Sequence, residues 1–128
     1  MAFLKARTGS SAGHLRLGRL GEDLAANALI GGGYKILHRN LKVYRREVDI
    51  IADHNGTLVF VEVKTRANHS FGTPLGSINH KREKRLREAA ELYAMRNKIT
   101  NRSIRFDVVS VDFSEGGGPK LEIIKNAF

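Results

Sequence analysis

The dipeptide Asn55-Gly56 is the feature that most restricts how this 128-residue chain can fold. It separates two runs rich in β-branched and apolar residues, Glu47–His54 and Thr57–Lys64. A type I′ turn needs positive φ at both central residues, and Asn followed by Gly tolerates this well, so the pattern predicts a two-residue hairpin. Paired residue numbers then sum to a constant, which places Asp49 opposite Glu62.

The predicted pairing gathers charged side chains on one face of the hairpin. Because strand side chains alternate with period 2, Glu62 and Lys64 share a face with Asp49. Directly opposed residues have Cβ atoms about 4.5 to 5.5 Å apart, and like charges there are destabilising. A shared proton or a divalent cation relieves the repulsion, and hard oxygen ligands suit Mg²⁺ or Mn²⁺. The alternative is an edge hairpin with solvated charges, although the apolar Val59, Val61 and Val63 favour a strand covered on both sides.

Composition indicates one globular domain with a polyanionic partner. The chain is 41% hydrophobic, and its formal net charge of +9, with a sequence pI near 10.3, points to nucleic acid rather than a membrane surface. The absence of cysteine excludes a disulfide scaffold and a Cys-based zinc site. With no apolar run of membrane-spanning length and no signal-peptide pattern, we expect a cytoplasmic protein without a membrane partner.

The region before the hairpin is predicted to hold one helix and one strand. Residues 1–13 are expected to form a mobile N-terminal arm, and residues 14–128 a single domain. Helical periodicity runs from about residue 15 to residue 30, with a broad face of small residues and leucines that includes Leu20, and three glycines then end the helix. Residues 34–40 are predicted as a strand, and residues 41–46 as a basic connection into the hairpin.

The region after the hairpin is predicted to add a second helix and more sheet. A helix over residues 79–97 would bury one stripe of side chains: Leu86, Ala89, Ala90 and Tyr93. A strand over residues 105–111 would run parallel to Thr57–Lys64 through a right-handed crossover, and residues 121–124 can add an edge strand. The expected fold class is α/β, a mixed β-sheet in the order αβββαβ(β) flanked by helices.

Basic residues concentrate near the predicted charged face. Cations at a helix N-terminus oppose the macrodipole, so phosphate binding is the interpretation for the start of the second helix: Lys81, Arg82, Lys84 and Arg85. A solvated face balanced by neighbouring glutamates is the alternative. Arg45 and Arg46 precede the first hairpin strand, while Arg66 and His69 lie in or beside the loop after the second, where substrate contacts often sit.

The motifs together resemble a known family. The short blocks are Gly18–Ala25, Glu47–Ala52, Val59–Arg66, Phe71-Gly72 and Arg105–Val108, in this order. They resemble the YraN-like family of the restriction-endonuclease-like PD-(D/E)-x-K superfamily, which is related to archaeal Holliday junction resolvases. The resemblance implies a restriction-endonuclease-like fold. Related resolvases act as dimers, because two symmetric cuts need two sites, so the resemblance makes a homodimer one possible state, and the sequence leaves the oligomeric state open.

The resemblance also implies roles for individual residues. Asp49 and Glu62 would be metal ligands together with the Val63 carbonyl, and Lys64 would position the attacking water. Glu22 matches the first-helix glutamate of the family and would assist the metal or its water. One departure is Arg46, which stands where the family typically has glycine and which could either restrict the bend of the strand or contact phosphate.

The predicted function is metal-dependent hydrolysis of phosphodiester bonds in DNA. The cation would bind the scissile phosphate and lower the pKa of water. Phosphate contacts position a substrate but carry no sequence information, so recognition would follow the shape of a junction, flap or nick. The alternative is a non-catalytic nucleic-acid-binding or adaptor protein on the same fold.

Overall fold

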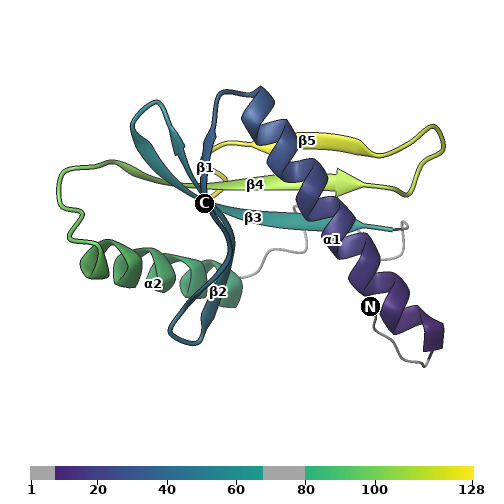
Figure 1. Ribbon diagram of the computed structural model, residues 1–128, viewed down its shortest axis with the longest axis horizontal. Coiled ribbons are helices and arrows are strands. Elements are labelled where there is room, and N and C mark those ends of the chain that lie inside the picture. Colours follow the sequence, from purple (N-terminus) through teal and green to yellow (C-terminus); the bar gives the residue numbers. More distant parts are fainter. Residues whose placement is uncertain (1–7, 68–79) are drawn as a thin grey trace.

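The computed structural model describes residues 8–67 and 80–128, which form one five-stranded sheet with a helix on each face (Figure 1). The elements are α1 (Thr8–Gly31), β1 (Lys35–Val43), β2 (Arg46–His54), β3 (Thr57–Arg66), α2 (His80–Arg96), β4 (Ile104–Asp112) and β5 (Lys120–Ile124). The sheet order follows the chain from β1 to β5, with β3 and β4 parallel and the other neighbours antiparallel. The predicted mixed α/β architecture is confirmed.

The hairpin between β2 and β3 has the predicted turn and register. Asn55 and Gly56 adopt φ values of 54° and 89°, and the pairs run from His54 with Thr57 to Ile50 with Val61. The register is constant along these pairs, so the next pair in a continuous ladder would be Asp49 with Glu62. The regular pairing stops before them.

The two helices cover opposite faces of the sheet because β3 is apolar on both faces. Val59 and Val61 pack with Ala25, Ala26 and Leu29 of α1. Leu58 and Phe60 pack on the other face with the buried stripe of α2, which consists of the predicted residues Leu86, Ala89, Ala90 and Tyr93. Figure 1 shows α1 crossing in front of β3, β4 and β5, with α2 beside β2.

Helix α1 differs from the prediction at its start and on one face. It begins at Thr8 instead of near Leu15, so residues 8–13, expected in an N-terminal arm, are helical; their mobility stays a prediction. Leu20, expected on the buried face, is 47% exposed, whereas Gly21, Ala25 and Leu29, expected on the same face, are buried. The helix ends at Gly31, as predicted, and the Tyr34 amide donates to the Leu29 carbonyl.

The predicted connection over residues 41–46 is instead strand and a tight turn. Strand β1 continues to Val43, which is 1% exposed in the core beside α2. Tyr44 then adopts a φ of 58°, and with Arg45 it closes a second hairpin between β1 and β2. The prediction was wrong because a bulky tyrosine is a rare residue in the left-handed region and gives no turn signal.

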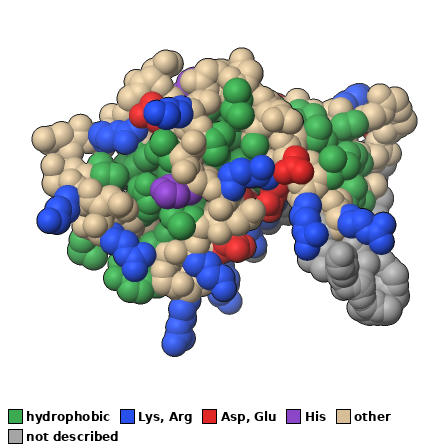
Figure 2. Space-filling model, in the orientation of Figure 1, with side chains coloured by type: hydrophobic (Ala, Val, Ile, Leu, Met, Phe, Trp, Pro, Cys, Tyr) green, Lys and Arg blue, Asp and Glu red, His purple; other side chains and the backbone are tan. Residues whose placement is uncertain are grey.

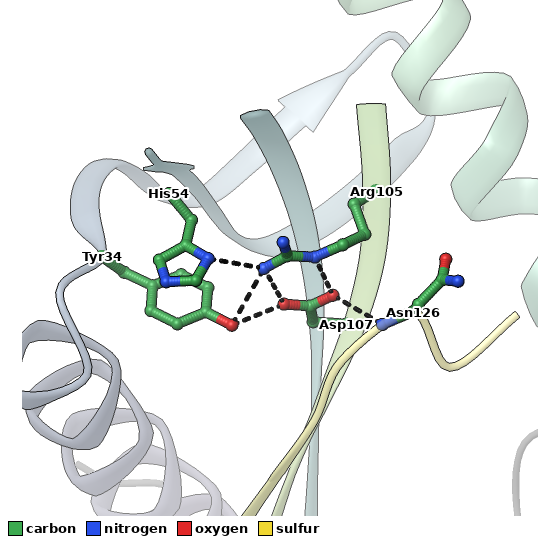
Figure 3. Close-up of polar contacts among 5 residues, drawn as sticks. All are labelled: Tyr34, His54, Arg105, Asp107 and Asn126. Carbon is green, nitrogen blue, oxygen red and sulfur yellow. Dashed lines mark hydrogen bonds and ion pairs between the residues drawn. The ribbon is translucent and has the colours of Figure 1, made fainter. Parts of the chain in front are cut away.

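A buried polar network links β4 to β2, to the segment after α1 and to the C-terminal end (Figure 3). Asp107 is fully buried and accepts hydrogen bonds from Arg105 at 2.8 and 2.9 Å, from the Tyr34 hydroxyl at 2.7 Å and from the Asn126 amide at 3.0 Å. Arg105 also contacts His54 at 2.9 Å. Burial alone would raise the pKa of Asp107, but the hydrogen bonds from Arg105, Asn126 and Tyr34 lower it below its ordinary value.

Candidate active site

The candidate site lies where β2 and β3 separate. Val48 packs in the core beside α2, whereas Ile50, two residues later, packs beside α1. Alternate residues of a regular strand share a face, so β2 twists sharply at Asp49. The backbone parting after the pair of Ile50 and Val61 leaves room for a side chain between the strands.

The Asp49 carboxylate fills that place. Its Oδ2 accepts a hydrogen bond of 2.8 Å from the Val63 amide, a donor that a continuous antiparallel ladder would have paired with the β2 backbone. Burial raises the pKa of Asp49 from 3.8 to about 7, with added repulsion from Glu62 and Glu22 and partial relief from the Val63 amide and Arg82. The aspartate is therefore held in place while its charge remains poorly compensated.

Glu62 is the second carboxylate and is nearly buried. Its side chain is 10% exposed, and its Oε2 lies 3.1 Å from Nζ of Lys64. The guanidinium of Arg82, in the first turn of α2, forms an ion pair with the same oxygen. The sequence had brought Glu62 and Lys64 together, and the structure adds Arg82 from a helix that follows almost twenty residues later.

A pocket of about 260 Å³ opens at the two carboxylates. Acidic side chains of Glu47, Asp49 and Glu62 lie among its walls, and Leu86 is the apolar member. The basic walls come from two elements, the hairpin turn and α2: Arg45, Arg46, Arg82 and Arg85. Four predicted nucleic-acid contacts thus converge around the predicted metal ligands.

The remaining predicted contacts are placed differently. Lys81 and Lys84 are exposed on α2, outside the set of described residues that line the pocket. Arg66 is half-buried at the end of β3, where its backbone carbonyl accepts from the Phe113 amide at 2.8 Å. His69 lies outside the described residues.

Arg46, the departure from the expected glycine, has a structural contact. Its guanidinium donates to Glu88 Oε1 at 3.0 and 3.1 Å and so links the first residue of β2 to the middle of α2. This ion pair answers part of the question raised by the sequence, since Arg46 both restrains the strand and lines the pocket.

Glu22 approaches the site from the opposite helix. It is half-buried on α1, close enough to Asp49 to contribute to the rise in the pKa of that carboxyl. The neighbouring Gly21 packs so tightly against β3 that an added Cβ would lie 2.1 Å from Thr65 Oγ1. This contact brings the backbone of α1 to the strand that carries Glu62 and Lys64, a closeness that the small-residue face had indicated.

The donor set fits a hard divalent cation. Within residues 8–67 and 80–128, no three His, Cys, Asp or Glu side chains form a metal-binding group. Mg²⁺ commonly needs only one or two protein carboxylates and keeps several waters, so Asp49 and Glu62 are a sufficient pair of side chains. The charge of Glu62 is balanced here by Lys64 and Arg82.

The fold and the site define the chain as a mixed α/β protein with a paired-carboxylate pocket walled by arginines. Residues 21–111 match the profile of a family described as uncharacterised protein family UPF0102. The chain belongs to this family, which is the YraN-like family that its sequence motifs resemble, so the resemblance is confirmed at the level of the family.

Relatives from several bacteria share nearly the whole length of the chain. A UPF0102 protein of Clavibacter michiganensis is 40% identical over 111 residues, covering 87% of this chain and 94% of the relative. A UPF0102 protein of Caldicellulosiruptor saccharolyticus is 43% identical over 113 residues, covering 88% and 96%. Dictyoglomus turgidum has another, 40% identical over 113 residues, with coverage of 88% and 96%.

Proposed function

We propose that the protein is a metal-dependent endonuclease with a restriction-endonuclease-like fold, acting on DNA of a particular shape. The observation that carries the proposal is the placement of Asp49 and Glu62 on strands that part between them, with Lys64 at 3.1 Å from Glu62. Asp49 and Glu62 open into a pocket whose rim is rich in arginine. Acidic ligands and phosphate-binding cations therefore meet in one place.

Each group has a chemical task in this proposal. Asp49 and Glu62 would hold Mg²⁺ or Mn²⁺, with the Val63 carbonyl as a further donor and Glu22 as an outer acidic partner. The metal, when bound, would polarise the scissile phosphate and lower the pKa of water. Lys64 is 17% exposed and directed at Glu62, so its ammonium can orient the water and balance charge that develops on phosphate.

The arginine rim supports recognition of the DNA backbone. Arg45 and Arg46 stand on the hairpin side of the pocket, and Arg82 and Arg85 on the α2 side. Phosphate contacts fix orientation without reading base sequence, so we propose selection of junctions, flaps or nicks. Lys81, Lys84 and Arg66 would extend this contact beyond the pocket. Figure 2 shows Lys and Arg side chains spread widely over one face of the molecule.

Two further proposals follow from the nuclease reading. If the substrate is a four-way junction, two symmetric cuts are needed, so the active form would be a homodimer. The location would be the cytoplasm, where the bacterial chromosome lies. No helix in the described part of the chain is long and apolar enough to span a membrane.

A second candidate function is nucleic-acid binding without cleavage. The observation that favours it is the ion pair between Arg82 and Glu62, which occupies a carboxylate that catalysis would need for metal. In that case the arginines would bind phosphate and the acidic pair would only organise the rim.

Cleavage of labelled single-stranded, duplex, flap and four-way-junction DNA in Mg²⁺ or Mn²⁺ separates the two functions. We expect the wild type to cut one branched form best, and Lys64→Met to bind that DNA while cutting it at least about 100-fold more slowly. Lys98→Met, at an exposed position after α2, is the matched control and should cut normally. Binding without cutting by the wild type on all four substrates would support the second candidate instead.

A further inference from the structure

The cations around Glu62 differ in how firmly they are held. Lys64 and Arg82 both approach Oε2 of this carboxylate. Lys64 belongs to the same strand, and its side chain is only 17% exposed. Arg82 comes from the first turn of α2, and its side chain is 50% exposed. Arg82 can therefore turn toward solvent with less loss of packing than Lys64.

The attachment of α2 does not depend on the Arg82 contact. The helix is held by its buried stripe, including Leu86 and Tyr93, and by the ion pair of Glu88 with Arg46. Because the guanidinium is half-exposed, solvent screens this ion pair and reduces what it contributes to stability. Stabilising the fold is therefore a weak explanation for the position of Arg82 on the nearly buried Glu62 carboxylate.

A divalent cation and the Arg82 guanidinium compete for the same carboxylate. Both are positive and both draw on the one nearly buried Glu62 carboxylate, so simultaneous occupation would place two cations close together and cost electrostatic free energy. Metal binding is therefore expected to be weaker while Arg82 holds Glu62 and stronger once Arg82 leaves. The displaced side chain would still stand on the pocket wall, one helical turn from Arg85, where a phosphate can receive it.

We propose that Arg82 is an exchangeable counter-cation that occupies the metal position in the free protein and moves to substrate phosphate when metal binds. The inference rests on the proposed function and deepens it, because it makes metal binding and DNA binding cooperative. Metal releases Arg82 for phosphate, and phosphate draws Arg82 away from Glu62. By linkage each ligand raises the affinity for the other. Arg82 is thus a positioning residue that prevents the acidic pair from holding metal tightly before DNA is present.

The test is Mn²⁺ binding by titration calorimetry in the absence of nucleic acid, using wild type, Arg82→Gln and Arg85→Gln. Both variants lose one positive charge from the pocket wall, but only Arg82 contacts Glu62. We expect Arg82→Gln to bind Mn²⁺ more tightly than Arg85→Gln, by about 5- to 150-fold, the usual range of a coupling between two ligands. Glutamine keeps part of the side-chain stem, and a melting curve confirms that each variant is folded.

A second arm measures the coupling itself. The affinity for a short duplex should rise on adding Ca²⁺, a hard cation with oxygen ligands, in the wild type and in Arg85→Gln but not in Arg82→Gln. Equal Mn²⁺ affinities in the two variants, or weaker binding by Arg82→Gln, would overturn the role of Arg82 while leaving the metal site intact. If neither the wild type nor Arg82→Gln binds Mn²⁺, the proposed function fails as well. Glu62→Gln, which should abolish binding, identifies the site in every case.

Discussion

Asp49 shows how one residue can be positioned and destabilised at once. Its hydrogen bond from the Val63 amide fixes the carboxylate between two strands, while burial and two neighbouring glutamates oppose its charge. A metal ion is the partner that relieves this opposition. In its absence, the carboxyl group should carry a proton over much of the range below neutral pH.

The pKa of Asp49 predicts a stability change with a definite sign. Because the pKa is about 7 in the folded protein and near 3.8 without these surroundings, the folded state binds more protons in this interval. The free energy of unfolding of the metal-free protein should therefore fall as pH rises from about 4 to about 7. Asp49→Asn removes that loss and should be about 1 to 2 kcal/mol more stable than wild type at pH 8, allowing for solvent screening.

Urea unfolding with a chelator at pH 5 and pH 8 measures this difference. Asp23→Asn, at an exposed residue paired with Arg39, is the control and should follow the wild-type profile closely. If the free energy of unfolding changes with pH in the same way for wild type and Asp49→Asn, the charge of Asp49 does not destabilise the folded protein.

Gly21 is the residue that sets the distance between α1 and β3. A Cβ at this position would lie 2.1 Å from Thr65 Oγ1 and 3.2 Å from Thr65 Cβ, so either the threonine or the helix must move. Gly21→Ala should cost roughly 1 to 3 kcal/mol of stability through overpacking. Gly18→Ala has nothing within 4 Å and should instead stabilise the helix by up to about 1 kcal/mol.

Denaturant midpoints of these two variants provide the comparison. If both substitutions stabilise the protein, α1 does not approach β3 this closely. The argument that Glu22 lies near Asp49 would then fail.

At the scale of elements, the Asp107 network joins two strands, β2 and β4, to the segment after α1 and to the C-terminal end. Arg105 and Asp107 lie on β4, His54 ends β2 and Tyr34 precedes β1 (Figure 3). Asp107→Asn would leave Arg105 poorly compensated beside a fully buried group, with an expected loss of about 3 to 5 kcal/mol. Because the pKa of Asp107 is lowered, its stabilisation is present above the unfolded pKa and is lost as acid protonates the folded carboxyl.

Thermal unfolding at neutral and acidic pH tests this element-scale prediction. The melting temperature of the wild type should approach that of Asp107→Asn as pH falls, whereas the exposed Asp23→Asn should cost about 0 to 1 kcal/mol at neutral pH. If Asp107→Asn has the same melting temperature as the wild type at pH 7, the network is not important for stability.

Local patterns explain why the hairpin and α2 were predictable. Asn55-Gly56 fixes the register, and the spacing of Leu86, Ala89, Ala90 and Tyr93 fixes the buried face of α2. The separation of the strands at Asp49 and the ion pair of Arg82 with Glu62 depend instead on contacts between elements. Their sequence signals were only an aspartate in an apolar run and a basic helix start. The positive φ of Tyr44 has no such signal, and the second hairpin turn was missed for that reason.

At the scale of the whole molecule, the net charge of +9 predicts how binding responds to salt. The logarithm of the DNA affinity should fall linearly with the logarithm of salt concentration, since bound phosphates release counterions. Arg45→Gln and Arg85→Gln, both on the pocket wall, should each reduce the slope by about 1. Lys120→Gln, on the edge strand β5 and paired with Glu115, should leave the slope unchanged. Equal slopes for all variants would place the DNA contact elsewhere.

The most direct measurement is the rate of cleavage of a labelled four-way junction in Mg²⁺ by wild type, Asp49→Asn and the charge-matched control Asp23→Asn. The account predicts cleavage by wild type and by the control, and a loss of at least about 100-fold in Asp49→Asn with junction binding retained. Cleavage by Asp49→Asn at the wild-type rate would contradict the assignment of the paired carboxylates as a catalytic metal site.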